Sequence, residues 1–337
     1  MNELHTSRRL AAIAAAYWRR SETLRYLPLR MWVEPTNKCN LRCTVCPNST
    51  DRTSPRGLMP IAMFNRIAAD CAGHTYDMNL SHRGESLFHP ELTGMIHACR
   101  HHGIRSRLHT NATILTTIRS RELILAGLNL MSFSFDGFDK QTYEDIRRGA
   151  CFEETLSNIL GFLREKRRLQ KRRPYTVFQV IDIGQNGGGD TARKAFLARF
   201  EGLPLDKLYV KQPHNWAGNM ADYGGAETVT PISPCTFPWY SLTVLWDGTV
   251  VPCPQDWYGV QPLGNLHRQS LWEIWNGAPM RTLRHRMKNF DLEGIEPCCR
   301  CDRVARATIL GVPVENMRAF LGETMLGYDL VRKIIRR

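Results

Sequence analysis

Three closely spaced cysteines constrain this chain more than any other feature. They stand as Cys39-Asn-Leu-Arg-Cys43-Thr-Val-Cys46, a C-x3-C-x2-C pattern directly after a predicted strand over Met31–Thr36. A structural zinc site needs a fourth ligand nearby, and the next histidine, His74, lies 28 residues further on. Three thiolates suit a cubane iron–sulfur cluster in which one iron keeps an open coordination position. We therefore expect Cys39, Cys43 and Cys46 to bind such a cluster.

Composition indicates a globular protein whose cysteines are kept reduced. It has 337 residues with eleven cysteines, whereas a disulfide scaffold is normally short and secreted. Metal ligation in the reducing cytoplasm is the better interpretation. The formal net charge of +13 suits an anionic partner without naming one. No apolar run approaches the roughly 18 residues that a membrane span needs, so we expect no transmembrane segment.

The N-terminal stretch needs separate consideration. Leu10–Trp18 is apolar and is bracketed by Arg8-Arg9 and Arg19-Arg20. Paired arginines before an apolar stretch are typical of an export signal, but the stretch is short and no small-residue cleavage site follows it. We expect residues 1–30 to form a basic amphipathic extension that covers the domain or makes peripheral contact with lipid.

The next part, residues 31–218, alternates strand-like and helical segments. Six β/α steps in about 180 residues indicate an α/β fold with a parallel sheet and right-handed crossovers, a partial (β/α)6 barrel of the TIM type. Side chains that carry chemistry in such folds follow the carboxyl ends of the strands. The expected strands are Met31–Thr36, Tyr76–Ser81, Ile104–Thr110, Leu130–Phe135, Tyr175–Ile183 and Lys207–Lys211.

A second set of cysteines lies in the C-terminal part, in a C-x17-C-x44-C-x2-C pattern. Its members are Cys235, Cys253, Cys298 and Cys301. A predicted hairpin, Ser241–Trp246 with Thr249–Pro252, separates the first two, and a predicted helix over Ser270–Lys288 precedes the last pair. Taken alone, four thiolates with a C-x2-C pair are typical of structural zinc. The neighbouring Cys299 is an alternative to Cys298 as a ligand.

These features predict two further segments. Residues 219–310 are expected to form a small domain that holds together by binding metal, because their apolar positions are too few to form a core alone. Residues 311–337 are expected to form a basic, helical tail.

The first cysteine loop resembles the signature of the radical SAM superfamily, and the resemblance covers about residues 31–215. It implies that the three cysteines hold a [4Fe-4S] cluster whose fourth iron binds S-adenosylmethionine (SAM). One electron from the cluster then cleaves SAM, and the 5′-deoxyadenosyl radical removes a hydrogen atom from the substrate. The resemblance also implies an electron donor such as flavodoxin or ferredoxin.

Three further segments match the family in order. Arg83-Gly84-Glu85-Ser86 stands where Gly-Gly-Glu-Pro is usual, Thr110-Asn111-Ala112 resembles Thr-Asn-Gly, and Ser134-Phe-Asp136-Gly137 resembles the segment after the fourth strand. Arg83 replaces a glycine, so the local backbone can differ. Arg147 is expected to be a surface arginine of a helix rather than a partner of the methionyl carboxylate. The resemblance implies that SAM is bound by Glu85, Asn111, Ser134 and Asp136.

The second cysteine set resembles the twitch region, the shortened form of the SPASM domain. This resemblance implies one auxiliary [4Fe-4S] cluster that Cys235, Cys253, Cys298 and Cys301 close completely. A full SPASM domain needs several more cysteines, and none follows Cys301. Known twitch enzymes include the dehydrogenase of an aminocyclitol alcohol. The resemblance therefore implies a dehydrogenase-like oxidation of a small sugar, aminocyclitol or head group.

Such an oxidation needs a proton acceptor near the substrate. We favour Lys211 and His214, after the sixth strand, as the base or as hydrogen-bonding groups, because they face the expected junction with the second domain. Arg83, Lys211 and the net charge would also suit an anionic substrate. Other polar residues that follow strands are His82, Arg83, His109, Asp182 and Gln185.

Two other classes of function deserve comparison. Maturation of a ribosomal peptide by thioether crosslinking or epimerisation is the alternative for an enzyme of this superfamily, although no recognisable peptide-binding domain precedes residue 31. A zinc-stabilised nucleic-acid binder is not expected, because the basic runs lack interleaved aromatic residues.

Overall fold

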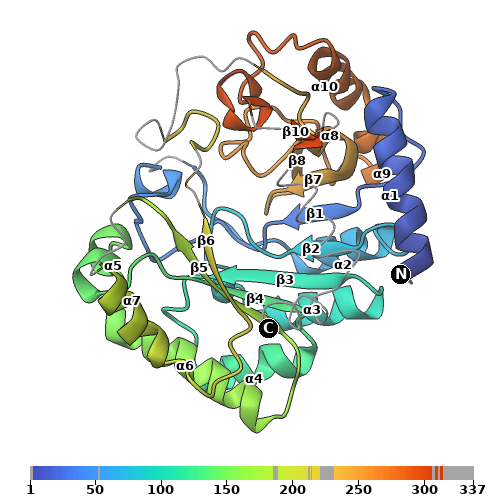
Figure 1. The fold of residues 1–337 in the computed structure, drawn as a ribbon. Coiled ribbons are helices and arrows are strands. Elements are labelled where there is room, and N and C mark those ends of the chain that lie inside the picture. Colours follow the sequence, from blue (N-terminus) through green and yellow to red (C-terminus); the bar gives the residue numbers. More distant parts are fainter. Residues whose placement is uncertain are drawn as a thin grey trace.

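A single large sheet organises the molecule. The computed structural model describes residues 3–51, 54–184, 189–211, 213, 215–220, 231–305, 308–309 and 312–313. Within this part, nine strands form one sheet in the order β6-β5-β4-β3-β2-β1-β7-β8-β9. Strands β1 to β6 run parallel to their neighbours, with helices packed along the sheet (Figure 1). The predicted α/β fold with a partial barrel is confirmed.

The β/α repeat follows the predicted order, and every strand except the sixth is shorter than predicted. Its elements are β1 Arg30–Val33, α2 Ile61–Asp70, β2 Asp77–Asn79, α3 Leu92–His101, β3 Arg105–Thr110, α4 Thr117–Ala126, β4 Leu130–Ser134, α5 Lys140–Ile146, α6 Phe152–Arg168, β5 Tyr175–Ile181, α7 Gly189–Ala198 and β6 Lys207–Lys211.

Local sequence explains where these helices begin and end. The side chain of Thr116 accepts a hydrogen bond from the backbone N–H of Arg119 and caps α4, which stops at Gly127 with a φ of +93°. Glutamates occupy the first turn of α6 and three basic residues its last turn, which complements the helix dipole.

The strand register separates two faces of the sheet. Met78, Leu108 and Phe133 are fully buried in the core that the sheet shares with its helices. The opposite face carries Arg107 and His109, because the residues of β3 alternate between half-buried and buried positions. This second, more polar face is the inner face of the partial barrel.

The remaining elements pack on the β1 side of the sheet. They are α1 Glu3–Trp18, α8 Phe237–Tyr240, β7 Ser241–Val244, β8 Thr249–Val251, β9 Gly264–Asn265, α9 Leu271–Trp275 and α10 Ala278–Lys288, with β10 Thr308–Ile309 and β11 Val312–Pro313 forming a separate pair. Strand β7 pairs in parallel with β1, and β8 returns antiparallel to β7, as expected for the predicted hairpin. One apolar core contains residues from both halves of the chain, so burial as well as metal can hold the C-terminal part together.

Helix α1 covers part of the molecule. Its Tyr17 hydroxyl donates to the carbonyl of Pro234 at 2.7 Å, and the Tyr17 ring meets the edge of Trp239 at 5.4 Å. Arg9 donates to the carbonyl of Leu27 at 2.6 Å. The extension therefore lies against the protein, as one of the two alternatives for residues 1–30 predicts. Among the described residues, no helix is both long enough and apolar enough to span a bilayer.

Two predictions about the C-terminal part need correction. The helix predicted over Ser270–Lys288 is two helices, because Gly277 adopts an extended conformation with a ψ of 164° and Pro279, in the first turn of α10, has no N–H with which to continue α9. Residues 312–313, expected to be helical, instead pair antiparallel with residues 308–309. The rest of the predicted tail, residues 314–337, and residues 221–230, which follow the expected boundary at residue 218, lie outside the described residues. The domain boundaries stay predictions.

Candidate metal centres and cofactor site

The first cysteine loop follows β1 at the carboxyl end of the barrel. Cys39, Cys43 and Cys46 are half-buried and form no disulfide. Neighbouring backbone braces the loop: the N–H of Arg42 donates to the carbonyl of Arg148 at 3.0 Å. Burial raises the pKa of all three thiols, that of Cys39 to about 11, and the other two thiols raise the pKa of Cys46 further. The three thiols therefore share one electrostatic site.

The donor chemistry of this loop fits an iron–sulfur cluster. Among the described residues, no three His, Cys, Asp or Glu side chains converge as they would around a single metal ion. Three thiols on one short loop are nevertheless the ligand set of a cluster with one open iron. Buried thiols lose their protons readily only when a metal supplies the compensating positive charge.

Gly84 brings the segment after β2 against the cysteine loop. A β-carbon at this position would lie 2.4 Å from the carbonyl oxygen of Thr36 and 2.7 Å from that of Lys38. The next residue, Glu85, donates its backbone N–H to the same Lys38 carbonyl at 2.8 Å. Only glycine permits this approach, so the segment keeps the close contact although Arg83 precedes it.

The Glu85 carboxylate is 2% exposed and is held beside the loop. It accepts hydrogen bonds from Thr110 Oγ1 at 2.9 Å, the N–H of Asn111 at 2.7 Å and the N–H of Leu87 at 3.1 Å. Burial raises the pKa of Glu85, while these bonds act in the opposite direction. Asn111 Nδ2 lies 3.9 Å from Cys39 Sγ. The structure thus brings the predicted residues Glu85 and Asn111 together at the first cysteine.

Asp136 and Arg147 form a buried ion pair at the second cysteine. Arg147 Nη2 donates to Asp136 Oδ2 at 2.5 Å, and Ile181 N–H donates to Asp136 Oδ1 at 2.7 Å. Arg147 Nη1 lies 4.0 Å from Cys43 Sγ. The expectation of a surface arginine is wrong: α5 ends at Ile146, and the chain then turns inward and leaves Arg147 only 7% exposed. Ser134, at the end of β4, is half-buried opposite Gln179 of β5.

The second cysteine set is assembled from separate segments. The thiols of Cys235 and Cys301 raise the pKa of Cys253, and those of Cys253, Cys301 and Cys235 raise that of Cys298, in each case after the larger effect of burial. The pKa of Cys299 is raised by burial and by Glu296, with no effect from the other thiols. The structure therefore groups Cys298, rather than Cys299, with the other three.

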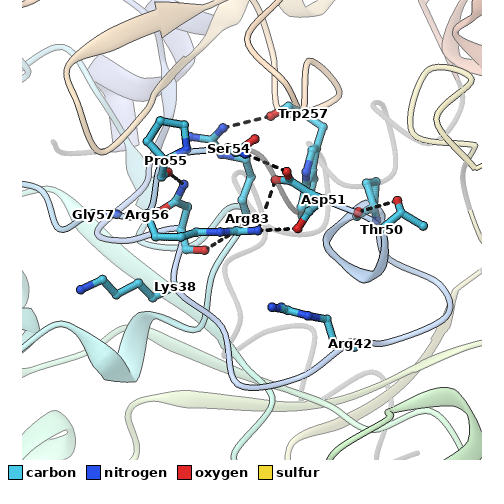
Figure 2. Close-up of polar contacts among 12 residues, drawn as sticks. Lys38, Arg42, Thr50, Asp51, Ser54, Pro55, Arg56, Gly57, Arg83 and Trp257 are labelled. Atoms are coloured by element: carbon cyan, nitrogen blue, oxygen red, sulfur yellow. Dashed lines mark hydrogen bonds and ion pairs between the residues drawn. The ribbon is translucent and has the colours of Figure 1, made fainter.

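A buried ion pair joins the barrel to the C-terminal region. Arg83 donates to Glu34 through Nε at 2.8 Å and Nη2 at 2.7 Å, and the side chains are 7% and 0% exposed. The N–H of Trp246 also donates to Glu34 at 3.1 Å. Arg83 Nη1 donates to the Trp257 carbonyl at 3.3 Å (Figure 2). Arg83 lowers the pKa of Glu34, and Glu34 raises that of Arg83, each against the effect of burial. Because the Glu34 carboxylate neutralises the Arg83 guanidinium, Arg83 is not available to bind an anion.

The residues expected to meet substrate are placed in part. Lys211 ends β6 and is half-buried, and its carbonyl accepts from the Asp182 N–H at 2.8 Å. His109 lies on the inner face of β3. His82 contacts Trp257 edge to face, with ring centroids 5.7 Å apart. His214 and Gln185 lie outside the described residues.

Sequence reasoning missed Glu34 and two tryptophans, Trp216 and Trp257. Glu34 lies inside the predicted strand Met31–Thr36, and a charged residue within an otherwise apolar strand was the available signal. Nothing in the local sequence of the tryptophans distinguishes them from core residues.

Family models match both halves of this arrangement. Residues 33–168 match the radical SAM superfamily, and residues 235–302 match the SPASM iron–sulfur cluster-binding domain. The chain is a radical SAM enzyme with a C-terminal SPASM domain. The first match contains Cys39, Cys43 and Cys46, and the second contains the four cysteines of the second set together with Cys299. This radical SAM enzyme accordingly uses SAM, a radical SAM [4Fe-4S] cluster and auxiliary iron–sulfur chemistry in its SPASM domain.

Individual relatives agree with the family. The tungsten-containing aldehyde ferredoxin oxidoreductase cofactor-modifying protein of Pyrococcus furiosus is 22% identical over 83% of this radical SAM enzyme and 90% of the relative. The crystal structure of BtrN with AdoMet and 2-DOIA is 19% identical, with a TM-score of 0.56 over 82% of this chain and 94% of BtrN. Streptococcus suis SuiB, bound to precursor peptide SuiA, is 12% identical, with a TM-score of 0.61 over 80% of this chain and 69% of SuiB. At these identities the solved structures establish the fold alone.

Proposed function

We propose that this enzyme oxidises a hydroxyl-bearing carbon of a small sugar, aminocyclitol or related head group. One observation supports the proposal: the four SPASM cysteines lie close to the barrel. Cys253 is four residues before Trp257 on the same loop, and Arg83 of the barrel donates to the Trp257 carbonyl. An electron acceptor at that position is what an alcohol radical needs. The BtrN structure, which contains AdoMet and 2-DOIA, supports the same substrate class.

The proposed reaction balances without an outside oxidant. When bound, the two iron–sulfur groups would supply one-electron chemistry: the first would donate the electron for SAM cleavage, and the auxiliary group would accept the electron that the substrate releases. The carbinol carbon loses a hydrogen atom to the 5′-deoxyadenosyl group, and the hydroxyl loses its proton to a base. The C–O single bond becomes a carbonyl, SAM becomes methionine and 5′-deoxyadenosine, and one electron leaves for each that entered.

The chain's own residues position SAM in this proposal. A carboxylate accepts about four hydrogen bonds, and Glu85 accepts three from protein groups, so it can still receive the methionyl amine. Asn111 and Ser134 are the other polar residues that we assign to SAM binding. Asp136 holds Arg147 near Cys43, where the cation favours a thiolate.

Proton transfer is the second role that the proposal assigns. Lys211 remains our candidate for the base or for a hydrogen-bonding group, because it lies at the carboxyl end of β6. His214 is proposed for the same role on its position in the sequence alone.

We also propose a docking face for the electron donor. Lys38 is exposed and Arg42 is half-buried, and they directly precede Cys39 and Cys43. Among the described residues, neither side chain forms an ion pair, and Figure 2 draws both apart from the Arg56–Asp51 contacts. An acidic carrier such as flavodoxin or ferredoxin, present in the reducing cytoplasm, would meet complementary charge close to the cluster ligands.

Maturation of a ribosomal peptide remains the second candidate. The fold likeness to SuiB bound to its precursor peptide favours it. A peptide substrate would be modified without release of a small-molecule ketone, so product analysis separates the two functions.

Anaerobic reconstitution tests the proposal. We expect about eight irons per chain, as two [4Fe-4S] clusters require, and 5′-deoxyadenosine and methionine after reduction with dithionite. Incubation with 2-deoxy-scyllo-inosamine and related polyols should give a carbonyl product by mass spectrometry. About four irons, or SAM cleavage without oxidation of any polyol tested, would contradict it.

A further inference from the structure

Three aromatic rings from separate segments meet at the mouth of the barrel. Trp257 contacts His82, which follows β2, at a centroid distance of 5.7 Å, and Trp216, which follows β6, at 5.0 Å. Trp216 Nε1 donates to the carbonyl of Val45 at 3.3 Å. Val45 lies between the second and third cysteines of the first loop, so these rings lie beside the radical SAM site.

Two nitrogen atoms of this group have no hydrogen-bond partner among the described residues. Trp257 is 1% exposed, yet its indole Nε1 is unpaired. His82 Nε2 is equally inaccessible and unpaired. Buried polar atoms nearly always have a partner in folded proteins, so each exception calls for an explanation, and a bound water or ligand is one such explanation. Two such atoms on rings in contact could both be satisfied by one bound ligand.

The charged groups around this site already have partners. Glu34 neutralises the Arg83 guanidinium, which also donates to the Trp257 carbonyl. Asp256 accepts the N–H groups of Val260 and Gln261, both at 2.9 Å. Burial lowers the pKa of His82 to about 4, so its ring is uncharged near neutral pH. An anionic group would find no free countercharge on these residues.

We propose that His82 Nε2 and Trp257 Nε1 bind hydroxyl groups on an uncharged, polyhydroxylated part of the substrate. A hydroxyl both donates and accepts, so it can pair with an indole N–H and with an imidazole nitrogen. The ring of Trp216 offers an apolar surface for the C–H groups of the same ligand. This inference rests on the proposed function and narrows its substrate class to compounds that carry no anionic group at this site.

Calorimetry on the reconstituted holoenzyme with SAM tests the site. The probes are the uncharged myo-inositol and scyllo-inositol, and the anionic myo-inositol 1-phosphate. Trp257→Phe removes the indole N–H and keeps an aromatic ring, and we expect at least tenfold weaker binding of whichever neutral probe binds the wild type. His82→Leu should have a similar effect, while His82→Gln, which keeps a terminal amide, should restore part of the affinity. Trp272→Phe, at an exposed site on α9, is the matched control and should bind normally.

The outcomes separate this inference from the proposed function. Binding of a neutral probe that depends on Trp257 but gives no carbonyl product supports the site and contradicts the oxidation. Failure of both neutral probes to bind the wild type, preference for the phosphate, or normal binding by Trp257→Phe would each overturn the inference. An equal loss of affinity for SAM in Trp257→Phe would assign the rings to SAM and overturn it as well.

Discussion

The two cysteine sets reach their positions in opposite ways. Cys39, Cys43 and Cys46 lie on one loop after one strand, and close backbone contacts from Gly84 and the segment after α5 support that loop. The SPASM cysteines come from separate segments, brought together because β7 pairs with β1 and the C-terminal core packs on the barrel. Substitution of the few residues that contact its loop should therefore affect the first site. The second site should depend on packing over a wide area.

Removing one ligand from each set should have the largest effects and tests whether the two sites have separate roles. Cys43→Ala is expected to abolish reductive cleavage of SAM, because three ligands are the minimum for the first cluster. Cys253→Ala should retain some cleavage but form no oxidised product. Chromatography of 5′-deoxyadenosine and product measures both. Equal loss of SAM cleavage in the two variants would contradict separate roles.

Substitution of the adjacent Cys298 and Cys299 tests which of the two thiols is a ligand at the second site. Cys298→Ser should lower the iron content by about four atoms per chain, the content of one auxiliary cluster. Cys299→Ser, whose thiol faces Glu296, should keep the wild-type content. Iron analysis after anaerobic reconstitution measures the difference, and the reverse result would assign Cys299 as the ligand.

Arg147 tests the support of the first loop. Arg147→Met leaves the Asp136 carboxylate buried without its cation, which typically costs about 3–5 kcal/mol. The neighbouring Arg148→Met is the control, because Arg148 is exposed and its change should stay within about 0.5 kcal/mol. Anaerobic urea unfolding gives both values. Similar free energies for the two variants would show that the ion pair contributes little.

Gly84 tests the close approach of backbone to the same loop. Gly84→Ala should destabilise the protein by about 1–3 kcal/mol and weaken SAM binding, because the added methyl group overlaps the Thr36 carbonyl. Gly161→Ala in α6 is the matched control: its β-carbon has open space, and alanine should stabilise the helix by up to about 1 kcal/mol. Unfolding and SAM titration compare them, and a neutral Gly84→Ala would rule out the tight contact.

The smallest expected effect is a pH dependence that arises from His82. Its pKa is lowered to about 4 by burial, whereas an unfolded histidine titrates near about 6.5. The unfolded state therefore binds the proton first, and stability falls as the pH drops from about 6.5 toward 4. Relative to His82→Gln, the wild type should lose roughly 1 kcal/mol between pH 7.5 and 5.5. Parallel pH profiles for the two proteins would show that His82 is not buried as a neutral ring.

Much of the fold was predictable because β/α alternation is a local pattern. Each strand of the barrel pairs with neighbours in sequence order, so turn and periodicity signals were sufficient. The pairing of β7 with β1 was not predictable, since it joins residues more than 200 positions apart. The break at Gly277 was missed because the helical periodicity on either side outweighed the local signal of Gly277 and Pro279.

The amino-acid sequence by itself determined the cluster loop, the order of the β/α units and the residue types at the strand ends, because these depend on contacts within short segments. Only the tertiary structure decided that Arg147 is buried against Asp136, that Glu34 neutralises Arg83, and that Cys298 rather than Cys299 faces the other thiols. These outcomes depend on which distant segments meet and exclude water. Burial and pairing of a charge are properties of the packed molecule, and no local pattern records them.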